Sequence, residues 1–454
     1  MSEEKNTYPG GEGKNDLYIG VRNDLSPFYV DLEALTRGLV VVGQSGCGKS
    51  FLVGRLVEEL VRKATEKTRL LIIDSNSDFC EGLRLKEDDK FKEKLDVYNS
   101  GVLEKGAFES FQDRELQAFN KLKDSSILPI GQIFGRGEEF NLSWKWLVDD
   151  YTRFLRIVKG NKFSASYLWA FLCLLSCMEP KYKYMPKEWI EGCTEILKQK
   201  YGQTVGFNYI IYRHALQYDK WLKSEYFLEL MPDLGKEVRS NIWRKKEDDK
   251  GLPEMLFAES NRINLIEVEK ITEKEARLKT VAFILLHCLD VHKDLTEKYR
   301  ESRTKENDQN ITEAEQNLKH TFILIDEAQN YAPEETNDPH EKMLGELIHT
   351  IAAEGRKYGL HVILATQRPN KIKRGLLGEC DNAIIMKMNS RSDLEHLARE
   401  MRILDVKLLE PCLHFQGQGN ALAVGEMTRM APYVQLFKSA PRRTREGGVD
   451  IPGF

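Results

Sequence analysis

The sequence predicts an α/β fold: a central, mostly parallel β-sheet covered by helices, with an α-helical insertion. Short apolar runs alternate with amphipathic stretches of helical periodicity along residues 17–139 and 251–454, which we assign to one α/β core. A glycine-rich turn joins one of these apolar runs to a helical stretch, as in the strand–helix units of parallel sheets. All six tryptophans and several helical patterns fall within 140–250, so we expect this segment to be a helical, aromatic-rich insertion.

The elements of the core follow one another in a simple order. Residues 1–16 are polar and rich in glycine, and we expect them to be disordered. Apolar runs of strand character lie at 17–21, 28–31, 38–42, 70–73, 262–268, 321–325, 361–365, 383–388, 421–424 and 433–437. Helical periodicity begins at Lys49 or Ser50 and recurs at 273–298, 342–357 and 392–401. Residues 300–319 are charged and poor in apolar side chains, and we expect a flexible charged loop there.

The composition is that of an ordinary soluble globular protein. Of 454 residues, 41% are hydrophobic and 30% charged, and the net charge is -4. This balance excludes a histone-like protein that coats DNA with its whole surface, but it allows a local basic patch. The N-terminus has no apolar signal segment, and no apolar run reaches the about 18 residues of a membrane span. With no C-x-x-C pair among eight cysteines, we expect a cytoplasmic protein without a membrane partner.

The turn between the run at 38–42 and the first helix fits the pattern G-x-x-x-x-G-K-[ST]. Its glycines let successive backbone N–H groups surround phosphate oxygens, and the helix that follows adds a positive dipole end. The Lys49 ammonium would bridge the β- and γ-phosphates, and the Ser50 hydroxyl would bind Mg²⁺. The guanine-reading pattern N-K-x-D is absent, which favours ATP. The predicted nucleotide site comprises Gly43, Gln44, Ser45, Gly46, Cys47, Gly48, Lys49, Ser50 and Phe51.

Two carboxylates follow the apolar run at 321–325. In a parallel sheet this strand ends at the edge where the phosphate loop lies, so both side chains would reach the nucleotide. We assign Asp326 to the Mg²⁺ shell and Glu327 to the polarisation of the water that attacks the γ-phosphate. Gln367 follows the run at 361–365, where its amide would sense the γ-phosphate or that water. Alternatively, Gln367 is a turn residue that stabilises Pro369.

With these motifs in place, the chain resembles the HerA-like branch of the HerA–FtsK motor ATPases over about 15–100 and 255–450. The tracts that carry the resemblance are GQSGCGKS, LIIDSNSDF, FILIDEAQNY, IAAEGRKYGLHVILATQRP and GNALAVGEMTRMAPYVQLF. Residues 354–369 are the most specific part, since phosphate loops are shared by many families. The resemblance implies a RecA-like P-loop NTPase fold. It also implies a homohexameric ring that hydrolyses ATP to move double-stranded DNA through its pore.

The resemblance also implies arginines that act between subunits of the ring. A guanidinium from a neighbouring subunit can stabilise the charge that develops on the γ-phosphate. Family members place one such arginine shortly before the phosphate loop and another in the tract E-G-R-K-Y-G. The matching positions here are Arg37 and Arg356. Alternatively, both are surface or sheet-capping arginines.

One departure from the family concerns the N-terminus. HerA proteins usually carry an N-terminal β-barrel that docks an associated nuclease. Only 42 residues precede Gly43, and we expect the chain to lack this barrel. The partner would then be a nuclease or another effector protein, for example one from a phage-defence module.

A basic loop follows the run that ends near Gln367. It holds Lys371, Lys373 and Arg374, which would contact DNA phosphates inside a ring. Alternatively, this loop is simply solvated.

The function we expect is an ATP-hydrolysing ring motor that translocates double-stranded DNA and serves DNA processing or antiviral defence. A first alternative is an ATPase that assembles or gates a partner effector enzyme, with translocation secondary. A second is a protein-remodelling ring of the AAA+ type, which the basic rather than aromatic character of the 371–374 loop disfavours.

Overall fold

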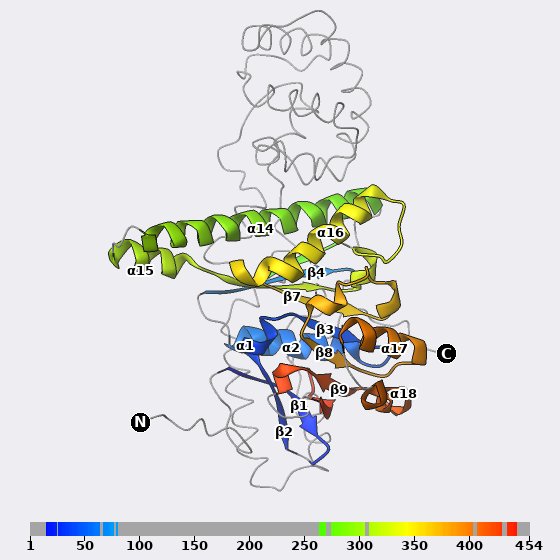
Figure 1. The fold of residues 1–454 in the computed structure, drawn as a ribbon. Helices are drawn as coiled ribbons and strands as arrows, with labels where there is room; N and C mark the ends of the chain where they lie inside the picture. Colours follow the sequence, from blue (N-terminus) through cyan, green and yellow to red (C-terminus); the bar gives the residue numbers. More distant parts are fainter. Residues whose placement is uncertain are drawn as a thin grey trace, which may run out of the picture.

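The computed structural model describes residues 15–24, 26–63, 67–76, 79, 263–268, 274–304, 308–402, 406–428 and 434–442. Within these ranges, ten strands form a single sheet in the order β2-β1-β10-β9-β8-β3-β7-β6-β4-β5 (Figure 1). The strands are β1 (Asp16–Arg22), β2 (Pro27–Asp31), β3 (Leu39–Val42), β4 (Thr68–Asp74), β5 (Ile263–Glu267), β6 (His320–Ile325), β7 (Leu360–Thr366), β8 (Asn382–Ile385), β9 (Asn420–Val424) and β10 (Val434–Ser439). The helices are α1 (Leu32–Leu35), α2 (Lys49–Lys63), α14 (Lys274–Thr304), α15 (Asp308–Asn317), α16 (Pro339–Glu354), α17 (Arg391–Glu400) and α18 (Pro411–His414).

The sheet has a parallel core and an antiparallel flank. Strands β8, β3, β7, β6, β4 and β5 are parallel neighbours. Strands β9, β10, β1 and β2 continue the sheet beyond β8 in antiparallel pairs. This topology confirms the predicted α/β fold with a mostly parallel sheet. It also brings the carboxyl ends of β3, β4, β6 and β7 to one edge, where ligands of such sheets bind.

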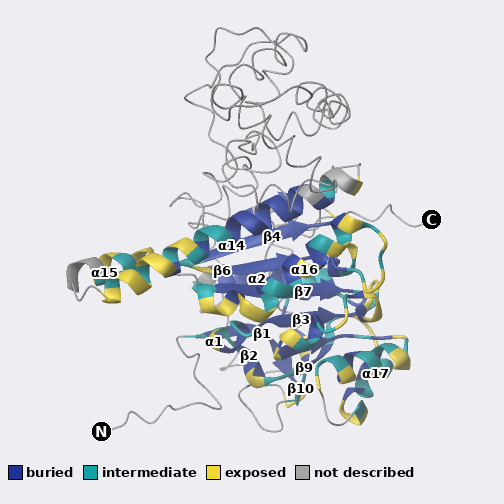
Figure 2. Ribbon diagram, turned by 45° about the horizontal axis from the view of Figure 1, so that its top comes forward, coloured by how far each residue is buried: buried dark blue, intermediate teal, exposed yellow. Residues whose placement is uncertain are grey.

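The sheet is buried on both faces, as the unbroken apolar runs of its strands require. Alternate residues of β3 show the division: Val40 and Val42 join one apolar cluster, and Leu39 and Val41 join the other. The first cluster packs under α14, α16 and α17, and the second under α2. Figure 2 shows the central strands buried, whereas α14 becomes exposed toward α15.

The predicted strands and helices of the described ranges are present, with ends that differ by a few residues. The charged segment 300–319 is the exception, because α14 continues to Thr304 and α15 occupies Asp308–Asn317. The expected flexible loop is therefore wrong for most of this segment. Its Glu, Gln, Lys and Arg side chains favour helix while remaining in water, so the low apolar content indicated exposure rather than a loop.

Two other expectations fall on residues that the structure does not describe. The proposed insertion at 140–250 lies wholly outside the described ranges, and so do residues 1–14. Of the segment expected to be disordered, Asp16 is the first residue of β1. No helix in the described part of the chain has the length and apolar character to cross a bilayer.

A buried group of charges joins α2 to β1. The Arg55 guanidinium is fully buried and pairs with Glu58 at 3.3 Å and with Glu59 at 2.8 Å. Glu59 also accepts a hydrogen bond from the backbone N–H of Tyr18, and the Nε–H of Arg55 donates to the Tyr18 carbonyl. Each charge is thus compensated, which burial demands.

Replacing Arg55 with alanine leaves two buried carboxylates without their cation. We expect Arg55→Ala to lower the free energy of unfolding by about 3–5 kcal/mol, seen as a lower urea midpoint. The matched control is Arg391→Ala, whose pairs with Glu395 and Glu410 are solvent-exposed. That change should cost less than about 1 kcal/mol. Equal midpoints for the two variants would contradict this account.

Candidate nucleotide-binding site

The glycine-rich loop connects β3 to α2 with a backbone that only glycine adopts easily. Gly46 and Gly48 have φ angles of 75° and 94°, in the left-handed region. A Cβ atom on Gly43 would lie 2.6 Å from Cys47 Sγ, so the start of the loop has no room for a side chain. The N–H of Gly43 donates to the Thr366 carbonyl, which ties the loop to the end of β7. The sequence pattern and the geometry therefore agree on a phosphate-binding loop.

The loop residues fit the phosphate groups of a nucleotide. Because α2 begins at Lys49, its first N–H groups have no acceptor within the helix and form the positive end of its dipole. No heavy atom within 4 Å would obstruct a Cβ at Gly46, so the outer side of the loop is open. Cys47 instead points into the core, where its thiol contacts Met386 and burial raises its pKa.

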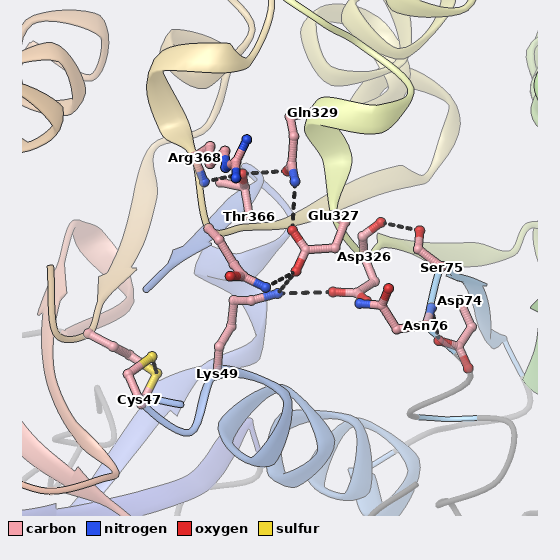
Figure 3. A network of polar contacts seen from close by, with 12 residues as sticks. Cys47, Lys49, Asp74, Ser75, Asn76, Asp326, Glu327, Gln329, Thr366 and Arg368 are labelled. Carbon is pink, nitrogen blue, oxygen red and sulfur yellow. Dashed lines mark hydrogen bonds and ion pairs between the residues drawn. The ribbon is translucent and has the colours of Figure 1, made fainter. Parts of the chain in front are cut away.

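The centre of the site is an ammonium group held between two carboxylates (Figure 3). Lys49 Nζ lies 3.1 Å from Asp326 Oδ1 and 3.0 Å from Glu327 Oε1, and all three side chains are buried. Burial alone would lower the pKa of Lys49, but the two carboxylates outweigh it and the pKa is raised. The lysine of the loop and the acids that follow β6 thus form one charged cluster, as the sequence predicts.

Glu327 is held in an unusual conformation. It is one of two non-glycine residues with positive φ in the described ranges, at φ 48° and ψ 53°. Such strain persists only where surrounding contacts impose it. Gln367 Nε2 donates to Oε1 at 2.7 Å, and Gln329 Nε2 donates to Oε2 at 2.7 Å. Burial would raise the pKa of Glu327, but Lys49 and the two amides lower it.

Gln367 therefore lies where the sequence predicts, beside Glu327 at the edge of the sheet. Gln329 was not predicted. It belongs to the short 3-10 helix η1 (Ala328–Asn330), two residues beyond Glu327. A polar residue directly after a strand is too common to single out, and only the tight turn of η1 brings its amide back onto the carboxylate.

Residues after β4 complete the surroundings of Asp326. Ser75 Oγ donates to the Asp326 carbonyl at 2.7 Å and lies 2.9 Å from the hydroxyl of Tyr331. Asn76 Nδ2 lies 3.4 Å from Asp326 Oδ2. The tract LIIDSNSDF was part of the family resemblance, but it did not predict contacts of Ser75 and Asn76 with Asp326. These contacts form because β4 and β6 are neighbours in the sheet.

The donor set around Asp326 suits a hard cation. Mg²⁺ prefers oxygen ligands, commonly one or two carboxylates together with substrate phosphates. Asp326 and the Ser50 hydroxyl, at the start of α2, are the residues that would hold it. When bound, the ion would neutralise charge on the phosphates.

Both arginines assigned to inter-subunit roles lie at the other end of the strands, where β3 and β7 begin. Arg37 precedes β3, and Arg356 lies in the 3-10 helix η2 (Gly355–Tyr358) just before β7. Strand β7 has seven residues, so roughly 20 Å separates Arg356 from the edge where Gln367 lies. Arg37 forms ion pairs with Asp381 and Glu426, each at 3.4 Å. Neither guanidinium belongs to the nucleotide site of its own chain.

The basic loop after β7 lies at the same edge as the nucleotide site. Lys371 and Arg374 are exposed, whereas Lys373 is partly buried and pairs with Glu346 of α16 at 2.7 Å. The loop runs beside the segment that follows η1: the N–H of Lys373 donates to the Ala332 carbonyl. Two of the three predicted DNA contacts are therefore presented to solvent.

A glycine loop between a parallel strand and a helix, with its lysine paired to the acids of a nearby strand, defines a P-loop nucleoside triphosphatase. Residues 17–124 match the family model described as the central domain of the helicase HerA. Residues 270–388 match the AAA model, described as the ATPase family associated with various cellular activities. These matches confirm the resemblance seen in the sequence: two parts of the chain are similar to the HerA central domain and to AAA ATPases.

Individual relatives are distant. A probable helicase of Methanocaldococcus jannaschii is 20% identical over 93% of this chain and 70% of its own length. The DNA double-strand break repair helicase HerA of Pyrococcus furiosus is 24% identical over 28% of this chain, and the aligned part spans only 22% of that protein. Among solved structures, the plasmid coupling protein TrwB with the GTP analogue GDPNP is 12% identical, with a TM-score of 0.45 over 95% of this chain and 90% of that chain.

Substitutions of Glu327 and Lys49 should have different effects on ATP binding and ATP hydrolysis. Glu327→Gln keeps the shape of the side chain but removes the negative charge that polarises water, so we expect ATP turnover to fall at least about 100-fold. ATP affinity, measured by calorimetry, should stay within a few-fold of the wild type. Lys49→Ala should instead abolish ATP binding. Turnover of Glu327→Gln close to the wild-type rate would show that the catalytic assignment is wrong.

Proposed function

We propose that the protein is an ATP- and Mg²⁺-dependent ring motor that translocates double-stranded DNA in the cytoplasm. The observation that carries this proposal is the separation of the nucleotide site from Arg37 and Arg356, which lie at opposite edges of one sheet. Arg37 or Arg356 would therefore reach a γ-phosphate at the loop only from another copy of the chain. Closed rings of like subunits, with six as the expected number, provide that contact at every site.

Duplex DNA is the proposed substrate for two reasons. The relatives described above include proteins named as helicases and as a DNA repair helicase. In addition, Lys371 and Arg374 are exposed at the edge that holds the nucleotide site. Exposed cations on a loop bind phosphates without reading sequence. We further propose that the motor serves a nuclease or another effector protein, including those of antiviral defence.

A second candidate function is suggested by the AAA match at 270–388, since that family of ATPases is not confined to nucleic acids. The protein would then assemble or gate an effector enzyme, or remodel proteins, and translocation would be secondary. Stimulation of ATP hydrolysis by duplex DNA distinguishes the two, because only the translocase requires it.

Mixing two inactive variants tests the inter-subunit arginine. Arg356→Ala retains a complete phosphate loop, and Lys49→Ala retains Arg356. If the arginine acts between subunits, mixed rings at equal amounts should recover about a quarter of the wild-type ATPase sites. The same mixture made with Arg37→Ala tests the other candidate. Wild-type activity in a stable monomer would contradict the arrangement, as would full activity of both arginine variants.

Duplex DNA should stimulate ATP hydrolysis, and salt should weaken its binding steeply. The double variant Lys371→Ala/Arg374→Ala should bind duplex DNA less tightly and reduce the slope of log affinity against log salt by about 2, since two phosphate contacts are lost. Lys298→Ala/Arg303→Ala removes two exposed cations of α14 and is the charge-matched control. If both double variants show the same slope, the 371–374 loop does not contact DNA.

A further inference from the structure

Glu327 is connected to the basic loop by an unbroken chain of hydrogen bonds. The backbone N–H of Arg368 donates to Thr366 Oγ1 at 3.0 Å, and the Thr366 hydroxyl donates to Gln329 Oε1 at 2.6 Å. Gln329 Nε2 in turn donates to Glu327 Oε2 at 2.7 Å (Figure 3). All three bonds point toward the carboxylate, so each strengthens the next.

The chain restrains the group that must polarise water. Glu327 accepts from Lys49 and Gln367 on one oxygen and from Gln329 on the other. A carboxylate with this many donors is held in one orientation and has fewer lone pairs free for water. Nucleotide phosphates attract both Lys49 and the Gln367 amide. Gln329 has no such alternative, because its own oxygen is held by Thr366.

The same chain begins in the segment that would meet DNA. Arg368 opens the loop that carries Lys371 and Arg374, and this loop is also bonded to the residues that follow η1. The Lys371 carbonyl accepts from the N–H of Glu334, and Ile372 pairs with Pro333. A shift of the loop would therefore move both ends of the Thr366–Gln329 contact.

We propose that Gln329 and Thr366 are positioning residues that restrain Glu327, and that contact of duplex DNA with the 368–374 loop releases this restraint. The proposal rests on the proposed DNA-dependent function. The coupling between DNA and hydrolysis would then depend on two side chains that bond to each other and to Glu327.

Kinetics of two variants test the restraint. Gln329→Ala and Thr366→Val should each raise the ATPase rate without DNA by about three- to tenfold, the range expected for the net contribution of one typical hydrogen bond. The DNA-stimulated rate should stay near the wild-type value, so the stimulation ratio collapses. Thr366→Ser keeps the hydroxyl and should restore the ratio. Asn330→Ala, an exposed position in the same turn, is the control and should change nothing.

Binding of DNA without nucleotide gives a second, independent measurement. Coupling is reciprocal, so releasing the loop should tighten duplex binding by Thr366→Val about fivefold in fluorescence anisotropy. If DNA stimulates both variants by the same ratio as the wild type, the restraint of Glu327 is overturned, but the proposed DNA-dependent function is not. If the variants hydrolyse ATP faster but DNA changes the rate of neither the wild type nor the variants, the proposed function is overturned. The restraint of Glu327 by Gln329 and Thr366 would still hold. If the variants hydrolyse ATP more slowly both with and without DNA, the restraint is also overturned, and Gln329 and Thr366 only support the structure around Glu327.

Discussion

The pairing of Lys49 with Asp326 and Glu327 is the interaction on which the rest of the site depends. Three charges are buried together, and burial of any one alone would cost several kcal/mol. The partners lie 277 residues apart in the chain and meet because β3 and β6 flank β7 in one parallel sheet. The order of the strands therefore has a direct chemical consequence: it delivers a cation and two acids to the same edge.

This cluster also links binding to catalysis. Phosphates that attract Lys49 simultaneously remove a partner from Asp326, which would bind the metal, and from Glu327, which would polarise water. The amides of Gln329 and Gln367 also hold the Glu327 carboxylate in place. The arginines at the far edge of the sheet cannot take part within one chain. In the proposed ring, hydrolysis would therefore depend on an arginine of a neighbouring subunit.

The sequence predicted the parts of the site that have a local cause. The glycines of the 43–50 loop, the apolar runs that become buried strands and the acids after β6 each follow from backbone geometry or burial. Gln329, Thr366, Ser75 and Asn76 were missed because their roles arise only from the packing of neighbouring strands and the turn of η1. The segment 300–319 was misjudged for a different reason, since a charged, exposed stretch can be as helical as a buried one.

The most direct test of the charged cluster is a structure of the wild-type protein with Mg²⁺ and a non-hydrolysable ATP analogue. We expect the phosphates to lie within the 43–50 loop, with Lys49 Nζ bonded to them and separated from Glu327. Asp326 and Ser50 should lie beside the metal. A nucleotide bound elsewhere, or a Lys49 that still holds both carboxylates with the analogue in place, would contradict the central claim.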